Sequence, residues 1–410
     1  MNVLVLNCGS SSVKYQLIET SLEHIARNSD RCLGRGCVER IGTRGALHTW
    51  EPADGERHTV GSEILEHRQA IAAIIDAFTH PERGIVGSHL EIGAIGHRMV
   101  HGGERFSQSV VITPEVERAI QDCCDLAPLH NPHNLAGYRA ARRALPELPH
   151  VAVFDTAYHQ TMPPHAYLYG LPYLMYQKHG VRRYGFHGTS HRYIGWRSQV
   201  LLGRPREQVK LITCHLGNGA SVCAIDHGRS IDTTMGFTPL EGLLMGTRTG
   251  DIDPSVVFHV MHKEELTERD VTVLLNKQSG LLGVSGLTND MRELLAAEAD
   301  GNARAKIAID MFCYRVRKAI GAFAAAMGGV DAVAFAGGIG ENSPEIRARS
   351  LAGLEFLGVT VDPERNAAAV GREGTISTAG SRVQALVIPT NEELLIARDT
   401  VRAVQGVHVH

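Results

Sequence analysis

The sequence predicts an α/β protein of two lobes, each built around its own β-sheet. Predicted strands alternate with predicted helices along the chain, a pattern typical of α/β folds. A strand, a glycine-bearing turn and a second strand occupy residues 3–18, and the same layout returns at 211–225. Two such units, about 210 residues apart, indicate a duplicated domain. A length of 410 residues is also too great for one ordinary core.

The composition is that of a globular protein, with 43% hydrophobic and 21% charged residues. The net charge of −3 predicts neither nucleic acid nor a membrane surface as a partner. The first apolar run is too short for an export signal, and no run approaches the roughly 20 apolar residues of a membrane span. We therefore expect a soluble, cytoplasmic protein whose eight cysteines are all reduced thiols.

The first half of the chain divides into elements by apolar spacing and turn residues. These patterns predict a helix over 63–79, a strand over 91–95 followed by a polar loop at 96–103, a helix that begins at Thr113-Pro114, and a strand over 151–154 that ends at Asp155. Threonine is a favoured helix cap and proline suits a first helical turn. The stretch from Asp155 to about Gly180 is irregular, and we expect it to cross between the lobes.

The second half is expected to form strands over 211–215, 221–225, 332–335 and 383–388, a long helix over 302–327, a glycine-rich loop at 337–342, and a last helix over 392–404. We expect the N-terminal lobe to comprise residues 1–155 plus 393–410, closed by that last helix. The C-terminal lobe would then comprise residues 156–392.

Three glycine-bearing loops follow predicted strands, at residues 7–14, 217–219 and 337–342. Glycine lets backbone N–H groups approach an anion closely. One such loop is as readily explained as a solvated hairpin, but three in one chain favour phosphate binding. No GxxxxGK[ST] loop or dinucleotide fingerprint occurs, which counts against a P-loop fold and a Rossmann site.

Two arginines lie among small residues at the ends of predicted strands, Arg98 in GHRMVHGG and Arg248 in MGTRTGD. A guanidinium presents a planar fork that matches carboxylate or phosphoryl oxygens. A lone arginine more often makes a surface salt bridge, yet this placement favours function.

His187 and His191 stand four residues apart, a spacing that also occurs in zinc sites. The glutamate of an HExxH motif is missing, and Gly188 and Thr189 are poor helix formers, so zinc is the weaker interpretation.

Carboxylates that could serve nucleotide chemistry stand at two places. Asp155 ends a buried strand, where a carboxylate favours a functional role. Glu392 and Glu393 begin the last helix, where acidic residues also stabilise a first turn. Mg²⁺, which nucleotide chemistry requires, takes oxygen ligands of this kind.

Nine segments together resemble the acetate kinase family of short-chain carboxylate kinases. They are NCGSSSVK at 7–14, GHRMVHGG at 96–103, FDTAYH at 154–159, YGFHGTSH at 184–191, HLGNGASV at 215–222, DTTMGFTPLEGLLMGTRTGDIDP at 232–254, NDMR at 289–292, GGIGENS at 337–343 and PTNEEL at 389–394. Their order covers nearly the whole chain. Residues 20–60 and the last few residues carry no segment that we can match to the family.

The resemblance implies a fold and a reaction. The fold would be two duplicated actin-like (ribonuclease H-like) domains, as in the acetate and sugar kinases, chaperones and actin, with nucleotide bound by the C-terminal lobe. The reaction would be reversible, direct in-line transfer of the γ-phosphoryl group of ATP to acetate, giving acetyl phosphate and ADP. The resemblance also implies a homodimer.

The same resemblance assigns residues. Asp155, His187 and Arg248 would be catalytic, and Arg98 would hold the substrate carboxylate. A metal ion, Mg²⁺ with Mn²⁺ as an alternative, would be held by Asn7 and Glu392. ATP would contact Lys14, His215, Leu216, Gly217, Asn218, Gly219, Asp290, Met291, Arg292, Gly338, Ile339, Gly340, Glu341 and Asn342. The acid's apolar end would meet Val100, Leu129, Phe186 and Pro239.

Elementary chemistry restricts the role of Asp155. A simple carboxylic acid with a pKa of about 4–5 is already ionised at neutral pH and needs no general base. We therefore expect Asp155 to orient Mg²⁺ or its waters. Three alternatives stay open: a propionate or other short-chain acyl kinase, a non-enzymatic nucleotide-switched module like actin or the chaperones, and a zinc hydrolase.

Overall fold

The computed structural model describes residues 1–128 and 130–407, so Leu129 lies outside the described residues. The chain forms two compact units. Unit 1 comprises Met1–Tyr158 together with the C-terminal segment from Asn391, and unit 2 comprises His159–Thr390. The domain boundaries expected from the sequence, at 155/156 and 392/393, remain a prediction. Within the described residues, no helix is long and apolar enough to cross a membrane.

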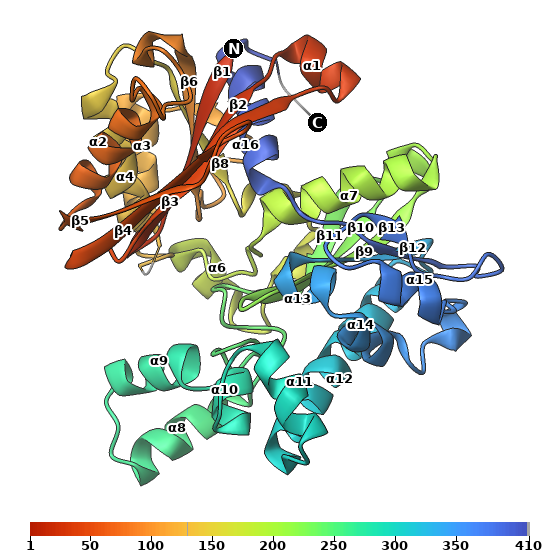
Figure 1. The fold of residues 1–410 in the computed structure, drawn as a ribbon. Coiled ribbons are helices and arrows are strands. Elements are labelled where there is room, and N and C mark those ends of the chain that lie inside the picture. Colours follow the sequence, from red (N-terminus) through yellow and green to blue (C-terminus); the bar gives the residue numbers. More distant parts are fainter. Residues whose placement is uncertain (129, 408–410) are drawn as a thin grey trace. The chain divides into compact units, whose positions relative to one another are not determined.

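Unit 1 contains an eight-stranded sheet with the strand order β5-β4-β3-β2-β1-β6-β8-β7 (Figure 1). Its elements are β1 (Asn2–Cys8), β2 (Ser12–Glu19), α1 (Leu22–Arg27), β3 (Arg31–Glu39), β4 (Thr43–Pro52), β5 (His58–Ile64), α2 (His67–Phe78), β6 (Ile92–Met99), β7 (Val110–Val111), α3 (Pro114–Asp122), α4 (Asn131–Ala144), β8 (His150–Phe154) and α16 (Glu392–Val404).

Unit 2 contains a six-stranded sheet with the order β11-β10-β9-β12-β14-β13. Its elements are α5 (Pro164–Tyr167), α6 (Tyr173–His179), α7 (Gly188–Leu202), β9 (Lys210–Leu216), β10 (Ala220–Asp226), β11 (Arg229–Thr233), α8 (Pro254–Lys263), α9 (Glu268–Lys277), α10 (Gly280–Ser285), α11 (Met291–Ala299), α12 (Ala303–Ala326), β12 (Ala332–Ala336), α13 (Gly337–Asn342), α14 (Pro344–Leu351), α15 (Pro363–Ala368), β13 (Gly374–Thr375) and β14 (Gln384–Val387).

The two sheets share one plan. In unit 1, β1 pairs antiparallel with β2 and parallel with β6, and β6 pairs parallel with β8. In unit 2, β9 pairs antiparallel with β10 and parallel with β12, and β12 pairs parallel with β14. The series β3-β2-β1-β6-β8 therefore matches β11-β10-β9-β12-β14, and the predicted duplicated α/β fold is confirmed.

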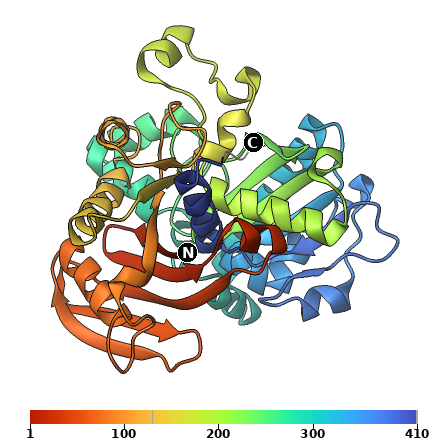
Figure 2. The ribbon, with the colours of Figure 1, turned by 90° about the horizontal axis from the view of Figure 1, so that it is seen from above.

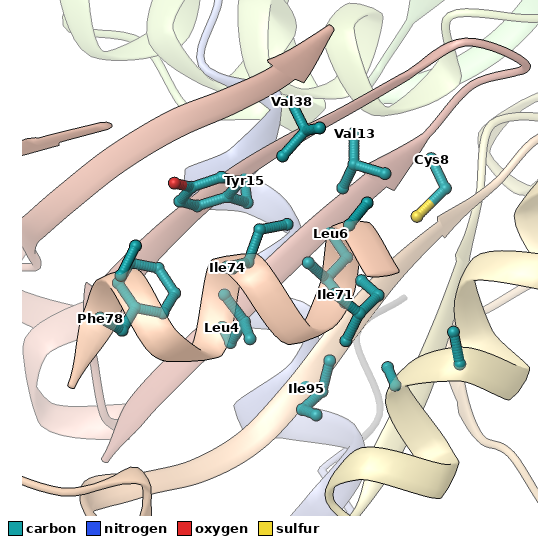
Figure 3. Close-up of a cluster of buried hydrophobic side chains, with 14 of the residues drawn as sticks. Leu4, Leu6, Cys8, Val13, Tyr15, Val38, Ile71, Ile74, Phe78 and Ile95 are labelled. Atoms are coloured by element: carbon teal, nitrogen blue, oxygen red, sulfur yellow. The ribbon is translucent and has the colours of Figure 1, made fainter. Parts of the chain in front are cut away.

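Alternation along β1 explains how the sheet of unit 1 is covered on both faces. Leu4 and Leu6 join a buried cluster with residues of α2, among them Ile71 (Figure 3). Val3 and Val5 pack on the opposite face, against α16, which Figure 2 shows in dark blue against the red strands. Each such side chain contributes about 1.5–3 kcal/mol when fully buried. The last helix is therefore a structural part of unit 1, and its first turn is held next to the sheet.

Three expectations about elements need correction. The helix expected from residue 63 begins at His67, because residues 58–64 form β5. Gly96–Met99 belong to β6, so Arg98 lies on a strand rather than in a loop. The glycine-rich segment at 337–342 forms the short helix α13 instead of a loop. Glu341 accepts from the N–H at its start, and Arg347 donates to the carbonyl oxygens at its end.

Two segments without clear sequence patterns also contain regular structure. Residues 31–64 supply β3, β4 and β5 at one side of the sheet of unit 1. The stretch expected to be irregular up to Gly180 contains α5 and α6. Prolines stand at the beginnings of these short helices, and their presence made the stretch resemble a loop in the sequence.

Candidate active site

A polar cluster in unit 1 lies where three parallel strands end. Asn7 is near the end of β1, Arg98 is near the end of β6, and Asp155 follows β8. Because β1, β6 and β8 run parallel, their carboxyl ends meet at one edge of the sheet. Lys14 of β2 stands directly across from Asn7 in the antiparallel register, so these two side chains share a face.

Arg98 and Asp155 form the centre of this cluster. The Arg98 Nε donates to Asp155 Oδ1 at 3.0 Å, and Nη2 donates to Oδ2 at 2.5 Å. The Arg98 Nη1 donates to the side-chain oxygen of Asn7 at 3.3 Å. The side chain of Asp155 is only 2% exposed. Burial would lower the pKa of Arg98, but the neighbouring Asp155 and Glu392 outweigh it and raise that pKa.

The first turn of α16 adds two more carboxylates. Glu392 Oε2 lies 3.8 Å from Arg98 Nε, and the Asn391 side chain caps the helix by accepting from the Leu394 N–H. Burial raises the pKa of Glu392, and the nearby negative charge of Asp155 raises it further. Burial and the charge of Glu392 likewise raise the pKa of Glu393.

This cluster has the donor set that a hard divalent cation needs. Asn7 offers an amide oxygen, and Asp155 and Glu392 offer carboxylate oxygens, the ligand types that Mg²⁺ takes. Burial already disfavours the charged form of Glu392, so a bound cation would offset the free energy lost by burying this carboxylate. The residues present therefore fit a magnesium ion.

In unit 2, His187 stands at the N-cap of α7 in the left-handed region, with φ 58°. A non-glycine residue rarely adopts this conformation, and such strain is concentrated at functional sites. The ring of His187 lies 4.3 Å from that of His215, measured between centroids. His215 is held in turn by the Ser190 hydroxyl, 2.8 Å from its Nδ1.

Arg248 approaches the same place from the loop that follows β11. Its Nη1 donates to the Pro239 carbonyl oxygen at 3.3 Å. Burial lowers the pKa of Arg248, and within the described residues no carboxylate forms an ion pair with it. A guanidinium that is partly buried without a counter-ion is suited to bind an anion from outside the protein.

The turn between β9 and β10 lies against both His187 and Arg248. A Cβ placed on Gly219 would lie 3.5 Å from His187 Nε2 and 3.7 Å from Arg248 Nη1. His187, Arg248 and the backbone of Gly219 therefore border one space, which glycine keeps open. Such a space can receive a phosphoryl group, because a guanidinium, an imidazole and the backbone of the turn border it together.

Three segments predicted to contact ATP lie together in unit 2. A Cβ on Gly217 would lie 4.0 Å from the Gly338 N, which joins the β9–β10 turn to α13. The Asn289 side chain donates to the Asn218 side-chain oxygen at 2.8 Å, which joins the turn to the start of α11. Gly338 has open space in front of its Cα.

The remaining residues of the predicted ATP site have local partners. Asp290 caps α11 and binds Arg292, whose hydrogen bonds lower the pKa of Asp290 to about 2. Asn342 donates to the Gly338 carbonyl oxygen at 3.0 Å. Glu341 accepts from the backbone N–H groups of Gly337 and Thr390, so its carboxylate ties α13 to the end of unit 2.

The residues predicted to line an apolar pocket can be placed separately in their units. Val100 in unit 1 and Phe186 in unit 2 are buried. Pro239 is half-buried, and its carbonyl oxygen accepts from Arg248. Leu129, the fourth predicted member, lies outside the described residues.

Sequence reasoning missed several supporting residues. Arg347 is fully buried and donates to the carbonyl oxygens of Gly340 and Glu341, so it fixes the end of α13. Ser190 and Ser221 hold the rings of His215 and His187. The two serines lie inside the segments that resemble the family, and this was the only indication of a role for them in the sequence. Nothing in the sequence indicated a role for Arg347, because an arginine on a helix is usually a surface residue.

The chain matches known proteins over nearly its whole length. A sequence model of the acetokinase family matches residues 2–398. The chain is 52% identical over 405 residues to an acetate kinase of Desulfitobacterium hafniense, a match that covers 99% of this chain and 100% of the relative.

Solved structures give the same result. The crystal structure of Porphyromonas gingivalis acetate kinase matches with a TM-score of 0.92 at 47% identity, covering 98% of this chain and 99% of that one. A propionate kinase from Francisella tularensis matches with a TM-score of 0.89 at 40% identity, covering 99% of this chain and 100% of that one. The resemblance seen in the nine segments is confirmed. The chain belongs to the acetokinase family and is an ATP-dependent kinase.

Proposed function

We propose that this chain transfers the γ-phosphoryl group of ATP to acetate, reversibly, giving acetyl phosphate and ADP. The observation that carries the proposal is Arg248, a partly buried cation that no described carboxylate neutralises, beside His187 and the open backbone of Gly219. Phosphoryl transfer spreads negative charge over three equatorial oxygens, and fixed cations supply most of the catalysis. His187 and Arg248 are suited to that charge.

The acceptor acid is assigned to Arg98. Asp155 grips this guanidinium through two of its nitrogens and so sets the direction in which the fork faces. Acetate needs no base, because its carboxylate is already ionised. Asp155 therefore acts as the residue that positions Arg98 and, as expected from the sequence, as an orienter of Mg²⁺ or its waters.

The metal ion is assigned to Asn7 and Glu392, with Asp155 beside them. Mg²⁺, or Mn²⁺ in its place, would neutralise charge on the phosphates of ATP when bound. Glu392 is held in place by the capped first turn of α16, so its carboxylate needs little ordering when the ion arrives.

The nucleotide is assigned to Lys14, the turn with residues His215 to Gly219, the segment Asp290 to Arg292, and Gly338 to Asn342. In the proposed step, one acetate oxygen forms a bond to the γ-phosphorus while the bond from that phosphorus to the ADP oxygen breaks. No proton moves. Lys14 and the backbone N–H groups of the turn hold the departing phosphates, and His187 and Arg248 hold the transferring group.

The choice of acid is assigned to Val100, Phe186 and Pro239 with Leu129. One methylene is worth only about 1–3 kcal/mol of discrimination, which corresponds to roughly 10–200-fold in rate. Acetate is the first choice because the acetate kinases of Desulfitobacterium hafniense and Porphyromonas gingivalis are 52% and 47% identical to this chain, against 40% for the propionate kinase. A propionate kinase is the second candidate, favoured by the similar solved structure of that name.

A hydroxylamine trap tests the proposal. Acyl phosphates react with hydroxylamine to give hydroxamates, so ATP, Mg²⁺ and each of acetate, propionate and butyrate are incubated separately with the enzyme. We expect most hydroxamate with acetate and none without the metal. Nucleotide binding without any hydroxamate would instead support the switch-like module, and a preference for propionate would support the second candidate.

We propose that the chain forms a homodimer, which the family resemblance implies, and that it works in the cytoplasm. Its proposed small-molecule substrates are ATP and a short-chain acid. Light scattering on a sizing column would show twice the mass of one chain, and a mass equal to one chain would contradict the dimer.

A further inference from the structure

A chain of hydrogen bonds runs from the sheet of unit 2 to His187. Thr213 of β9 lies with its hydroxyl oxygen 2.8 Å from Nδ1 of His191. The His191 Nε2 lies 2.7 Å from the Ser221 hydroxyl, which in turn lies 2.9 Å from Nδ1 of His187. Thr213, Ser221 and His191 are each 0% exposed. These three side chains are therefore shielded from water, and their hydroxyl and imidazole groups must find their hydrogen-bond partners within the protein.

The direction of the chain follows from the number of protons available. A threonine or serine hydroxyl has one proton to donate, and a neutral imidazole has one N–H and one acceptor nitrogen. In one direction, Thr213 donates to His191, His191 donates to Ser221, and Ser221 donates to Nδ1 of His187. In the other direction every bond reverses, and the Thr213 hydroxyl becomes an acceptor.

Only the first direction satisfies Thr213. In the part of the chain that the structure describes, the Thr213 hydroxyl has no hydrogen-bond partner except Nδ1 of His191. If the chain ran in reverse, the buried Thr213 proton would have no acceptor, which is costly in a dry interior. Burial, with the nearby rings of His159 and His215, also lowers the pKa of His191 well below its usual value, so that ring is neutral as this direction requires.

We infer that Ser221 and His191 are positioning residues that make Nδ1 of His187 a hydrogen-bond acceptor and place the imidazole proton on Nε2. The Nε2 atom faces the space that Gly219 leaves open beside Arg248 Nη1. His187 thus presents an N–H donor toward that space. This inference rests on the proposed function, in which the transferring phosphoryl group occupies the space.

Charged and titratable groups approach His187 from three elements of unit 2. Arg248 comes from the loop after β11, His215 of β9 lies beside His187 with the two rings tilted, and His191 belongs to the same helix. Adding a second proton to His187 would place it on Nδ1 and force the whole chain to reverse. His187 is therefore expected to act as a neutral donor rather than as an imidazolium.

The test measures the tautomer of His187 in the full-length enzyme. The protein is labelled with ¹⁵N in its imidazole rings, and long-range ¹⁵N–¹H spectra at pH 7.5 distinguish the two neutral tautomers and the imidazolium. The signals of His187 are those that vanish in His187→Gln. We expect the Nε2-protonated tautomer. A proton on Nδ1, in the neutral or the charged ring, would overturn the inference by itself.

A matched pair of variants separates positioning from packing. Ser221→Ala removes the donor to His187, and we expect a mixture of tautomers and a fall in kcat of about tenfold, with KM values unchanged. Ser198→Ala removes the same atoms from a fully buried serine of α7 whose hydroxyl has no hydrogen-bond partner within the described residues. It should leave the tautomer and kcat unchanged.

The outcomes are distinguishable. If Ser221→Ala lowers kcat but leaves the tautomer of His187 as in the parent enzyme, Ser221 is merely structural and the inference is wrong. If the parent enzyme forms no hydroxamate with any acid, the proposed function fails. The tautomer measurement would still show in which direction the hydrogen bonds to His187 run.

Discussion

Arg248 is the residue on which the chemistry depends most. It is a partly buried guanidinium without a carboxylate partner among the described residues, so its charge is available to a ligand. Arg248→Ala should lower kcat by about 10³-fold or more, as expected when a cation at a phosphoryl transition state is lost. Arg248→Lys should recover only part of this, because an ammonium lacks the planar fork. Steady-state rates with ATP and acetate measure both. Near-normal turnover in Arg248→Ala would remove Arg248 from the mechanism.

Asp155 has two proposed tasks that one substitution separates. Asp155→Asn weakens the grip on Arg98 and removes a negative charge beside Asn7 and Glu392. We expect the KM for acetate and the Mg²⁺ concentration for half-maximal rate both to rise. Titrations of acetate and of Mg²⁺ measure the two effects separately. An unchanged Mg²⁺ requirement would exclude the metal role, and an unchanged KM would exclude the positioning of Arg98.

At this scale the sequence was informative where chemistry needs an unusual residue. Arg98 and Asp155 could be singled out because a charge at the end of a buried strand is uncommon. Ser221 and Arg347 could not, because a serine in a strand or an arginine in a helix is ordinary until its partners are known. Their roles depend on contacts between residues far apart in the chain, which no local pattern encodes.

The helix α16 is tied to unit 1 by a buried ion pair. Arg398 Nη2 donates to Asp30 Oδ2 at 2.5 Å, and the two side chains are 4% and 3% exposed. Asp30→Asn removes the negative charge that neutralises the buried Arg398, so unfolding in urea should show a loss of about 3–5 kcal/mol. Arg27→Ala is the control, because the pair of Arg27 with Glu23 is exposed and should be worth at most about 1 kcal/mol. Equal effects of the two substitutions would contradict the structural role given to Asp30.

The same pair predicts a dependence on pH. Burial alone would raise the pKa of Asp30, but hydrogen bonds from Arg398 and Thr20, with the arginine charge, lower it below its usual 3.8. A carboxyl whose pKa is lowered by folding stabilises the protein above the unfolded pKa, and this contribution is lost as the pH falls through the folded pKa. The stability difference between the parent protein and Asp30→Asn should therefore be full at pH 7 and shrink below about pH 4. A difference that stays constant down to acid pH would contradict this assignment.

Elements were predictable where the pattern was local. The apolar run from Val3 to Leu6 predicted a strand, and the spacing of apolar residues predicted α12 and α16. The strands β3 to β5 were not predicted, because they lie toward the edge of the sheet and carry mixed, exposed residues. The helix α13 was hidden by its glycines, which are poor helix formers held here by Arg347 and Glu341.

The duplication belongs to the whole molecule. The recurrence of strand, turn and strand indicated it, but the strand order of each sheet could not be read from the sequence, because pairing between distant strands is a tertiary property. Each unit supplies a distinct part of the proposed chemistry. Unit 1 carries the groups assigned to the metal and the acid's carboxylate, together with Lys14. Unit 2 carries the other groups assigned to the nucleotide and the transferring phosphoryl group, together with Phe186 and Pro239.

The proposed mechanism predicts that the phosphoryl group passes directly from ATP to the acid, because no residue of the protein is proposed to carry it between them. The most direct test uses ATP that is chiral at the γ-phosphorus through its oxygen isotopes. A single in-line displacement inverts the configuration in acetyl phosphate, and inversion is the predicted result. Retention would require two displacements through a phosphorylated intermediate and would contradict direct transfer.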